Sequence, residues 1–495
     1  MRPAIQGISM SSQSKSRFSN ERRSWLAIVM MPLAACSEAP PQREQIGRPD
    51  IILISIDSLR QDHVGCYGYA RDTTPTIDRL AREGACFVNA VSTTSWTLPA
   101  HAALFTGLYD SSHGVVNIDS QLADEHVTLA EVLRAAGYQT CGFFGGPFLH
   151  PTFGLDRGFA SYLNCMTTVS DDSPDDVFRS YPAHAASHSD ITGPRTLERF
   201  GAWLDAADER PMFVFLHLWD VHYDYIPPQH YVDMFDPDYR GSINAEHFNH
   251  NDSIRPDMEK RDLQHVIALY DGEIRFTDDM VRQFLARLRD AGRLDQALIV
   301  VLSDHGEEFF EHGGKGHQRT LFDEVVRVPL IFWWPARIDT SRLVTDQVSL
   351  IDVMPTLLSL AGIPLPVEVQ GRDLSPLMDG SSLPGEPALL ELLVFGQQAR
   401  ALRTNSYKLL VDDLRKQTGF FDLQLDPNET MNRGQDPRLQ VAMADLRSIT
   451  RQSLDLRRAT RSAELSEALM DQLRSLGYTD DAKDSGSERN EGRKD

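Results

Sequence analysis

Apolar runs that alternate with helical patterns dominate the chain from about residue 50 onward. Residues 50–56 and 297–302 are runs of aliphatic and β-branched residues, typical of buried parallel strands. Further strands are predicted at 138–144, 212–218 and 328–333. Helical spacing of apolar residues predicts helices at 76–84, 98–106, 128–136, 195–207, 262–291 and 352–361. This alternation predicts an α/β sandwich around a mostly parallel central sheet.

The pattern changes after about residue 365, where the predicted strands become shorter. These strands are expected at Ala388–Val394, Ala399–Thr404, Tyr407–Val411 and Gly419–Leu423, and a helix is expected at 436–457. We therefore expect a smaller C-terminal α+β subdomain over residues 366–478. The polar residues 479–495 predict a disordered tail.

The N-terminus has the pattern of a targeting segment. Arg22 and Arg23 precede an apolar run that is too short to span a bilayer, and Leu33-Ala34-Ala35-Cys36 resembles a bacterial lipoprotein cleavage box. We expect a lipoprotein signal peptide at 1–35 and a tether at 36–48, with Cys36 attached to a membrane through its lipid. The alternative is a plain secretory signal with an incidental cysteine.

The predicted location is the bacterial cell envelope. Ser37, directly after the lipidated cysteine, carries no evident inner-membrane retention signal, so we expect the outer membrane, facing the periplasm or the exterior. The chain has four further cysteines, Cys66, Cys86, Cys141 and Cys165, which allow three disulfide pairings in an oxidising compartment. They form no Cys-x-x-Cys pair, which argues against a zinc knuckle.

The net charge of the chain argues against certain classes of binding partner. The 495 residues carry a formal net charge of −22, which argues against nucleic acid or an anionic lipid surface as a partner. An anionic substrate would therefore need local positive charge at its site, from a metal ion and a few cationic side chains.

One candidate site is the segment 95–107, which reads as a polar turn followed by a helix. Thr97 is a predicted N-cap, Pro99 falls in the first turn, and Gly107 is a predicted stop. A hydroxyl at a helix N-terminus lies among free N–H groups, an environment that suits a phosphate or sulfate. The alternative is an ordinary capping threonine.

Two acidic residues follow the strongest predicted strands. Asp57 closes the run from residue 50, and Asp304 with His305 follows the run 297–302. Parallel strands deliver ligands at their carboxyl ends, so these side chains and Thr97 form an oxygen- and nitrogen-rich set suited to Mn²⁺, Zn²⁺, Mg²⁺ or Ca²⁺. The alternative is that both aspartates only cap strand ends.

The order of these motifs resembles the sulfatase family of the alkaline phosphatase superfamily. Asp57 is followed by Thr97-x-Pro-x-His-x-x-Leu-x-Thr-Gly and then by Asp304-His305-Gly, and the resemblance continues through 313–317, 327–332 and 421–429. It covers residues 50 to 435. It implies an alkaline-phosphatase-like α/β/α sandwich with a catalytic domain at 49–365. It also implies a divalent metal ion on Asp57, Asp304 and His305, with an oxygen from Thr97.

The chain departs from the sulfatase pattern at several positions. Sulfatases carry a cysteine or serine, matured to formylglycine, at the place of Thr97, and usually an arginine at the place of His101. Ser58 replaces the second of two adjacent aspartates, and His305 replaces an asparagine. The Gly-Lys-Trp-His segment has no match after Tyr138. Because threonine cannot become the formylglycine aldehyde, no formylglycine is expected.

These departures change the expected chemistry. A formylglycine hydrate expels sulfate by re-forming its aldehyde, whereas a covalent threonine ester must be cleaved by water. Relatives with a threonine nucleophile and an Asp-His pair are phosphodiesterases, phosphonate monoester hydrolases or phosphoglycerol transferases. The resemblance thus implies a metal-dependent hydrolase of sulfate or phosphate esters, with phosphodiester or phosphonate monoester favoured. A phosphoglycerol-type transferase and a catalytically silent ester-binding protein are the alternatives.

Three more candidates come from the same resemblance. His222 stands where the family has a histidine that contacts the substrate. The alternative is that His222 is a structural residue paired with Asp220. Lys315 would hold an anionic oxygen, and His317 would protonate the leaving group or join Asp220 and His222 around a second metal. The catalytic candidates are therefore Thr97, His101, His222, Lys315 and His317. The substrate class is a small-molecule, glycan or lipid-head-group ester. The natural ester, the number of metals and the oligomeric state stay open.

Overall fold

A computed structural model describes residues 47–166, 191–338, 341–365, 369–457, 460–475 and 478. The predicted signal peptide, nearly all of the predicted tether, including Cys36, and the predicted tail lie outside these residues. Within the described ranges, no helix combines the length and the apolar character needed to cross a membrane.

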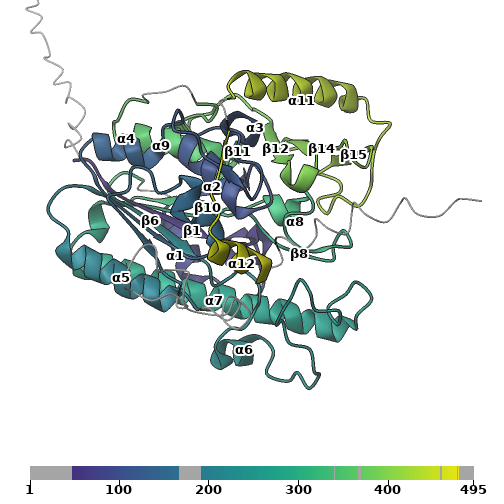
Figure 1. Cartoon of the computed structure of the whole chain (residues 1–495), viewed down its shortest axis with the longest axis horizontal. Coiled ribbons are helices and arrows are strands. Elements are labelled where there is room, and N and C mark those ends of the chain that lie inside the picture. The colour runs from purple at the N-terminus through teal and green to yellow at the C-terminus, as the bar shows by residue number, and fades with distance from the viewer. Residues whose placement is uncertain are drawn as a thin grey trace, which may run out of the picture. The chain divides into compact units, whose positions relative to one another are not determined.

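The described residues form a large central sheet (Figure 1). Its strand order is β11-β2-β10-β7-β1-β6-β4-β5, and β10 runs antiparallel to both of its neighbours while the other pairs are parallel. The strands are β1 (Asp50–Ile56), β2 (Ala85–Val91), β4 (Gln139–Phe144), β5 (Ser161–Asn164), β6 (Met212–Leu218), β7 (Ala297–Ser303), β10 (Leu330–Trp333) and β11 (Arg342–Ser349). The central strands β1, β6 and β7 are buried along their whole length, as their continuous apolar sequences require.

Helices cover both faces of this sheet (Figure 1). One face carries α1 (Pro75–Glu83), α5 (Gly193–Ala206) and the long α7 (Lys260–Asp290). The other carries α2 (Thr97–Thr106), α4 (Leu129–Ala135) and α9 (Val353–Leu360). The predicted alkaline-phosphatase-like α/β/α sandwich with a mostly parallel sheet is thereby confirmed.

Three strands of the central sheet were not predicted. Strand β2 lies directly after α1, and β5 and β11 form the two edges of the sheet. The first half of β11 is mostly exposed and mixes a charged residue with apolar ones, so its sequence resembles a loop. Pairing with β2, rather than local hydrophobic pattern, makes it a strand.

A second, antiparallel sheet follows in the C-terminal part of the chain. Its strands are β12 (Ala388–Leu392), β13 (Ala399–Arg403), β14 (Tyr407–Asp412) and β15 (Gln417–Asp422), and α11 (Arg438–Asp455) packs on it. A buried cluster that includes Ala103 of α2 and Leu402 of β13 joins this sheet to the sandwich. The predicted smaller C-terminal α+β unit is therefore present, and its core is continuous with the helix that carries Thr97.

Short elements complete the described fold. The helical ones are α3 (Asp110–His113), α6 (Gln229–Phe235), α8 (Asp323–Val326), α10 (Ser375–Met378) and α12 (Glu467–Ser475). Strand β3 (Ser120–Gln121) pairs with β16 (Arg461–Ser462), and β8 (Glu308–Phe309) pairs with β9 (Lys315–Gly316). Helix α12, which was not predicted, packs against the single turn η3 (Pro147–Leu149) that follows β4.

The four cysteines within the described residues are thiols in this structure. They are Cys66, Cys86, Cys141 and Cys165. None of the three possible disulfide pairings is therefore formed here.

Candidate active site

Adjacent parallel strands bring two carboxylates together. Strands β1 and β7 pair in register up to Ile56 and Ser303, so the next residues, Asp57 and Asp304, leave the sheet side by side. Ligand atoms of Asp57, Asp304 and His305 all lie within 4.8 Å of one another, and the three side chains are buried. The sequence predicted this convergence at the carboxyl end of the sheet.

Thr97 joins this cluster from the first turn of α2. Its Oγ1 lies 3.4 Å from Oδ2 of Asp57 and 3.2 Å from Nε2 of His305. The prediction of Thr97 as the N-cap was wrong, because Trp96 is the N-cap and Thr97 is the first helical residue. The hydroxyl therefore faces the carboxylates instead of bonding back to the helix. The predicted stop at Gly107 is confirmed, with the left-handed φ of 67° that glycine favours.

Local hydrogen bonds define the protonation of His305. Its Nδ1 lies 2.9 Å from the carbonyl oxygen of Gly306, which can only accept, so Nδ1 carries the proton. The lone pair of Nε2 then faces Thr97. This atom can accept a proton from the Thr97 hydroxyl or bind a cation.

The pKa values of the two carboxyl groups are shifted in opposite directions. Burial raises the pKa of Asp57, but the neighbouring His217, His222 and His305 outweigh it and hold this pKa well below its usual value. Burial and the negative charge of Asp57 raise the pKa of Asp304 well above its usual value. Two buried carboxylates at this distance need compensating positive charge.

The donor set fits a divalent cation. Oδ2 of Asp304 is buried and accepts no hydrogen bond from the described residues. Two carboxylates, one imidazole nitrogen and one hydroxyl are hard or borderline ligands, which suit Mn²⁺, Zn²⁺, Mg²⁺ or Ca²⁺. Asp57, Asp304, His305 and Thr97 are thus the residues that would hold the metal.

Ser58 shapes the backbone between these ligands. Its hydroxyl donates to Oδ1 of Asp57 over 2.8 Å, and its backbone N–H donates to Oδ1 of Asp304 over 3.2 Å. Its φ of 58° places it in the left-handed region, which serine rarely adopts. Ser58 therefore orients both carboxylates at the position where sulfatases often carry a second aspartate.

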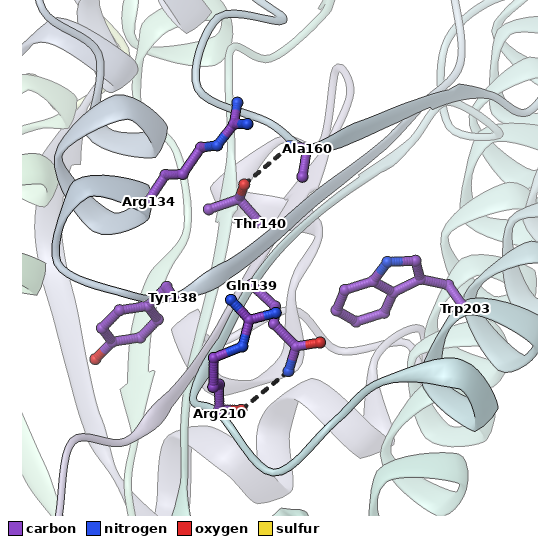
Figure 2. A pocket seen from close by; sticks show the side chains of 7 residues that line it. All are labelled: Arg134, Tyr138, Gln139, Thr140, Ala160, Trp203 and Arg210. Atoms are coloured by element: carbon purple, nitrogen blue, oxygen red, sulfur yellow. Dashed lines mark hydrogen bonds between the residues drawn. The ribbon is translucent and has the colours of Figure 1, made fainter.

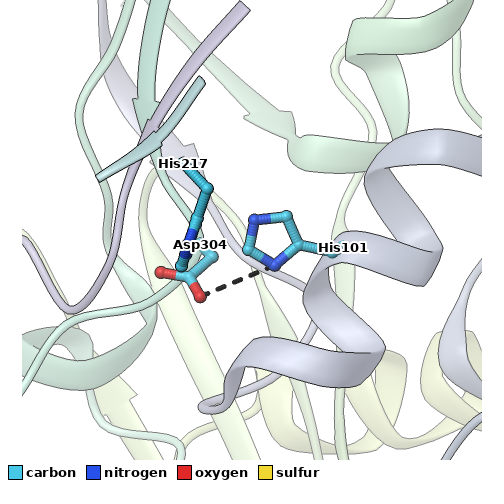
Figure 3. Close-up of side chains that lie close together, drawn as sticks. All are labelled: His101, His217 and Asp304. Carbon is cyan, nitrogen blue, oxygen red and sulfur yellow. Dashed lines mark ion pairs between the residues drawn. The ribbon is translucent and has the colours of Figure 1, made fainter. Parts of the chain in front are cut away.

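His101 lies behind the nucleophile candidate. Its Nδ1 is 2.8 Å from the carbonyl oxygen of Thr97, and its Nε2 is 3.0 Å from Oγ of Ser55. Figure 3 shows its ring between α2 and the strand end, with Nδ1 3.7 Å from Oδ2 of Asp304. Burial lowers its pKa to about 3. Both ring nitrogens are thus engaged by the protein, and His101 supports the first turn of α2.

His217 is a site residue that the sequence reasoning missed. Strand β6 places it beside Ser55 of β1, and its Nε2 lies 3.3 Å from Oδ2 of Asp57. It also belongs, with His101 and Asp304, to a second group of neighbouring ligand atoms (Figure 3). The available signal was a histidine within the apolar run 212–218, since a buried strand does not hold a polar side chain without a partner.

Two further histidines face each other across the site. His222 and His317 have ring centroids 5.0 Å apart, and His317 lies 4.4 Å from the ring of His305. Burial lowers the pKa of His222 to about 3 and holds the pKa of His317 well below its usual value. The structure therefore brings both predicted histidines next to the Asp57–Thr97–His305 cluster.

Glu307 orients His317. Its Oε1 lies 3.2 Å from Nδ1 of His317, and its Oε2 accepts a hydrogen bond of 2.8 Å from the hydroxyl of Tyr225. Burial raises the pKa of Glu307 to about 7. The sequence reasoning missed this residue, although it directly follows the Asp304-His305-Gly306 motif.

Lys315 and Asp220 are engaged elsewhere. The ammonium of Lys315 donates to the carbonyl oxygens of Asn251 and Ile254 over 2.9 and 2.8 Å. The carboxylate of Asp220 accepts from the Thr192 hydroxyl and the Gly193 N–H at the start of α5. The alternative in which His222 is a structural partner of Asp220 therefore does not match these contacts. The option of a second metal site on Asp220, His222 and His317 stays a prediction.

A separate cavity lies at the opposite end of the strands. It has a volume of about 360 Å³ and is lined by Arg134 of α4, Trp203 of α5, the start of β4 and the segments just before β5 and β6, the latter with Arg210 (Figure 2). Tyr138 and Gln139, which also line it, stand at the amino end of β4, whereas the carboxylates follow the carboxyl ends of β1 and β7. This cavity therefore belongs to a different part of the sandwich from the candidate active site.

Comparisons with known proteins match most of the chain. The family model described as "Sulfatase" matches residues 49–363, and that of "N-sulphoglucosamine sulphohydrolase, C-terminal" matches 311–455. The Ulvan-active sulfatase of Formosa agariphila is 26% identical over 451 residues, covering 85% of this chain and 84% of that protein. Human arylsulfatase A is 29% identical over 410 residues, covering 73% of this chain and 74% of that protein.

Solved structures share the fold. BT4656, determined in complex with its substrate D-glucosamine-2-N,6-O-disulfate, matches with a TM-score of 0.68 and 19% identity over 82% of this chain and 98% of that one. The phosphonate monoester hydrolase of Agrobacterium radiobacter matches with a TM-score of 0.65 and 22% identity over 85% and 98% of the two chains.

Proposed function

Because the chain belongs to the sulfatase family and is an ester hydrolase, we propose that it is a metal-dependent hydrolase whose nucleophile is Thr97. The observation that carries this proposal is the position of Thr97 Oγ1, 3.4 Å from Asp57 and 3.2 Å from His305, among three neighbouring ligand side chains. A hydroxyl in such a place can be both deprotonated and oriented for attack on the ester.

The proposed chemistry has two steps. Bound at Asp57, Asp304 and His305, a divalent cation would lower the pKa of the hydroxyl and neutralise oxygens of the ester. Thr97 gives its hydroxyl proton to solvent and Oγ1 attacks sulfur or phosphorus, so that the bond to the ester oxygen breaks and protonated His222 or His317 gives its proton to the leaving alcohol. Water then cleaves the covalent Thr97 ester: the same imidazole takes one proton of the water, and the released Thr97 oxygen regains a proton from solvent.

The identity of the proposed nucleophile helps to predict whether the enzyme prefers sulfate or phosphate esters. Oxidation of a threonine side chain would give a ketone, so Thr97 cannot supply the formylglycine aldehyde, and the covalent intermediate must be released by water. Metal-assisted attack by water is effective on a phosphorylated hydroxyl. We therefore propose that phosphate diesters or phosphonate monoesters are preferred over sulfate esters. The curated relatives, in contrast, are named sulfatases.

Release of nitrophenol tests this proposal. The soluble form, residues 37–495, is incubated with nitrophenyl sulfate, phosphate monoester, phosphate diester and phosphonate monoester, each with and without Mn²⁺ or Zn²⁺. Faster turnover of the diester or phosphonate, dependent on metal, supports the proposal. Faster turnover of the sulfate than of the other esters would overturn the phosphate preference. A rate that is the same with added metal, without it and with a chelator would overturn metal dependence.

We also propose where the enzyme acts and on what class of substrate. The lipoprotein box ending at Cys36 favours attachment to a bacterial envelope membrane. The relatives named above include an ulvan-active sulfatase and a glucosamine disulfate complex, which favours a glycan ester, whereas the phosphonate hydrolase neighbour favours a smaller ester. A panel of sulfated and phosphorylated glycans beside lipid-head-group esters separates these classes.

A further inference from the structure

The cavity at the amino end of β4 has a cationic lining, unlike the chain as a whole. The polar and aromatic residues that line it are Arg134, Tyr138, Gln139, Thr140, Trp203 and Arg210 (Figure 2). Two of them are arginines, and none of the described residues that line the cavity is acidic. The chain, in contrast, carries a formal net charge of −22. A cationic cavity in so acidic a protein favours a negatively charged ligand.

Arg134 lies on one side of the cavity without a partner. It belongs to α4, it is exposed, and its guanidinium forms no hydrogen bond or ion pair with the described residues. A guanidinium presents five N–H donors in a planar fork. Arg134 is therefore available to a carboxylate, sulfate or phosphate group, whose oxygens match that fork.

Arg210 lies on the short segment before β6, and hydrogen bonds hold the backbone of this segment in place. The side-chain amide of Gln139 donates to the carbonyl oxygens of Asp208 and Arg210 and accepts from the N–H of Asp208, each over 3.1 Å. Arg293 donates to the same carbonyl oxygen of Arg210 over 2.9 Å. These bonds fix the backbone of Arg210 at the edge of the cavity.

The guanidinium of Arg210 is only partly used by the protein. Its Nε and Nη2 donate to the carboxylate of Asp208, whereas its Nη1 donates to none of the described residues. Both side chains of this ion pair are more than half exposed, and an exposed ion pair is weak because water competes with it. A ligand anion can therefore bind Nη1 or replace the Asp208 carboxylate.

The opposite wall of the cavity is held in the same way. The hydroxyl of Thr140 donates to the carbonyl oxygen of Gly158 over 2.7 Å and accepts from the N–H of Ala160 over 2.9 Å. Gln139 and Thr140, two neighbouring residues of β4, thus tie down both segments that flank the cavity. A ligand would meet a site that is already formed, so binding requires little ordering of the protein.

The volume of the cavity and the indole of Trp203 indicate the class of ligand. A volume of about 360 Å³ lies in the range of small-ligand sites. Trp203 is half-buried, and its ring packs edge-on against Phe143 with centroids 6.4 Å apart. The face of an indole is electron-rich and attracts the polarised C–H groups of a sugar ring. An inorganic anion would use the two arginines but gain nothing from Trp203, so an anionic sugar fits this set of groups better.

We propose that this cavity binds an anionic sugar unit of a glycan chain, with its sulfate or carboxylate on Arg134 and Arg210 and its ring on Trp203. The proposal rests on the proposed function only for the source of the sugar, namely the glycan whose ester the enzyme hydrolyses. Strand β4 is six residues long, so about 20 Å of strand separates the cavity from the carboxyl edge of the sheet. A chain of several sugars can span that length, and binding at the cavity raises its effective concentration at the candidate active site.

Isothermal titration calorimetry tests the cavity with the soluble form that carries Thr97→Ala, so that no ester is turned over. The probes are a chondroitin sulfate hexasaccharide, the neutral chitohexaose and inorganic sulfate. We expect Arg134→Gln with Arg210→Gln, added to this background, to weaken binding of the sulfated hexasaccharide at least about 10-fold, because two charge-assisted contacts are lost. Chitohexaose and inorganic sulfate should both bind more weakly than the sulfated hexasaccharide. Binding at the candidate active site is common to all these proteins and cancels in the comparison.

Arg282→Gln with Arg415→Gln is the matched control. Like Arg210, each of these arginines is exposed and paired with an aspartate, one on α7 and the other between β14 and β15, and neither lines the cavity. Equal loss in this control, or no loss in the cavity variant at an unchanged thermal midpoint, would overturn the proposal. Inorganic sulfate that binds as tightly as the hexasaccharide would overturn it as well, since the indole would then have no role.

A second measurement reports on the indole. Tryptophan fluorescence should change when the sulfated hexasaccharide is added, and Trp203→Phe, which keeps an aromatic ring in place, should lose this change. An unaltered response in Trp203→Phe would contradict contact between the sugar and the indole. If the parent enzyme hydrolysed none of the esters, the proposed function would fail, whereas calorimetry and fluorescence would still decide whether the cavity binds an anionic sugar.

Discussion

Nε2 of His217 lies 3.3 Å from Oδ2 of Asp57, although the two residues are 160 positions apart, His217 on β6 and Asp57 directly after the neighbouring strand β1. The same carboxylate contacts the hydroxyl of Thr97. His217 thus stabilises the charged form of Asp57 and orients it toward the place of the proposed metal.

Replacement of His217 should weaken metal binding. Side chains that hold a metal ligand in place typically contribute 10- to 100-fold in affinity, and we expect a loss of about that size in His217→Ala. Titration of metal-free protein with Mn²⁺ or Zn²⁺ measures it. His265→Ala, which removes a buried histidine bonded to Asp236, is the control and should bind metal normally. Equal affinities in parent and His217→Ala would contradict the assigned role.

Removal of the Thr97 hydroxyl should abolish turnover without unfolding the protein. Thr97→Ala should lower kcat at least about 1000-fold, as expected when a nucleophile is lost. Thr97→Ser, which keeps a hydroxyl on the first residue of α2, should retain measurable activity. Circular dichroism and a thermal midpoint close to the parent establish folding. A Thr97→Ala variant that keeps most of its turnover would mean that another group attacks the ester.

Lys315 should matter less for catalysis than its motif implies. Because its ammonium is bonded to the carbonyl oxygens of Asn251 and Ile254, Lys315→Met should change kcat less than about 10-fold. A cation that holds the transition state would be worth about 100- to 1000-fold instead. Steady-state kinetics on the nitrophenyl ester that the parent enzyme hydrolyses fastest distinguishes these outcomes. A loss of the larger size in a folded variant would mean that Lys315 turns toward the substrate during the reaction.

An ion cluster should govern the attachment of the C-terminal sheet. Asp323 of α8 bonds to Arg403 over 2.7 Å and to Lys408 over 3.0 Å, and both cations are buried. Asp323→Asn leaves them without their shared carboxylate and should lower the free energy of unfolding by about 3–5 kcal/mol. Urea denaturation measures this change. Asp208→Asn, which breaks the exposed pair with Arg210, is the control and should leave the midpoint nearly unchanged.

The same cluster predicts a dependence of stability on pH. Burial raises the pKa of Asp323, but Arg403 and Lys408 outweigh it and hold this pKa well below its usual value. A carboxylate with a depressed pKa in the folded state stabilises the protein above the pKa of the unfolded chain, and this contribution disappears as the pH falls. The difference in stability between the parent and Asp323→Asn should therefore shrink in acid. A difference that grows below pH 4 would contradict the assignment.

Cys36 should determine localisation. Expressed in a bacterium, the parent protein should incorporate labelled fatty acid and sediment with the envelope membranes. Cys36→Ser should lose the label and, if the signal is still cleaved, appear in the soluble fraction. Cys165→Ser, which changes a buried thiol of the sandwich, controls for the loss of a cysteine. Label retained in Cys36→Ser would refute the lipoprotein assignment.

Several features of the site followed from the sequence because they depend on local pattern. The apolar runs ending at Asp57 and Asp304 identified buried parallel strands, and parallel strands end at one edge of a sheet. The helix from Thr97 to Thr106 was likewise marked by Pro99 and the glycine after it. Local pattern failed at the capping of α2, where the Thr97 hydroxyl bonds to the site instead of the helix.

Only the tertiary structure decided which of the other polar side chains lie in the candidate active site. His217 meets Asp57 because β6 pairs with β1 in one particular register, and Tyr478 meets His222 because a distant helix docks beside β4. Lys315 was assigned to the site by its motif, yet two carbonyl oxygens bind its ammonium. The sequence by itself determined the fold class, the family and the carboxylates at the strand ends, since these are encoded by short patterns and their order. The tertiary structure decided the partners of each buried polar atom, since such atoms must find hydrogen bonds wherever packing brings donors and acceptors together.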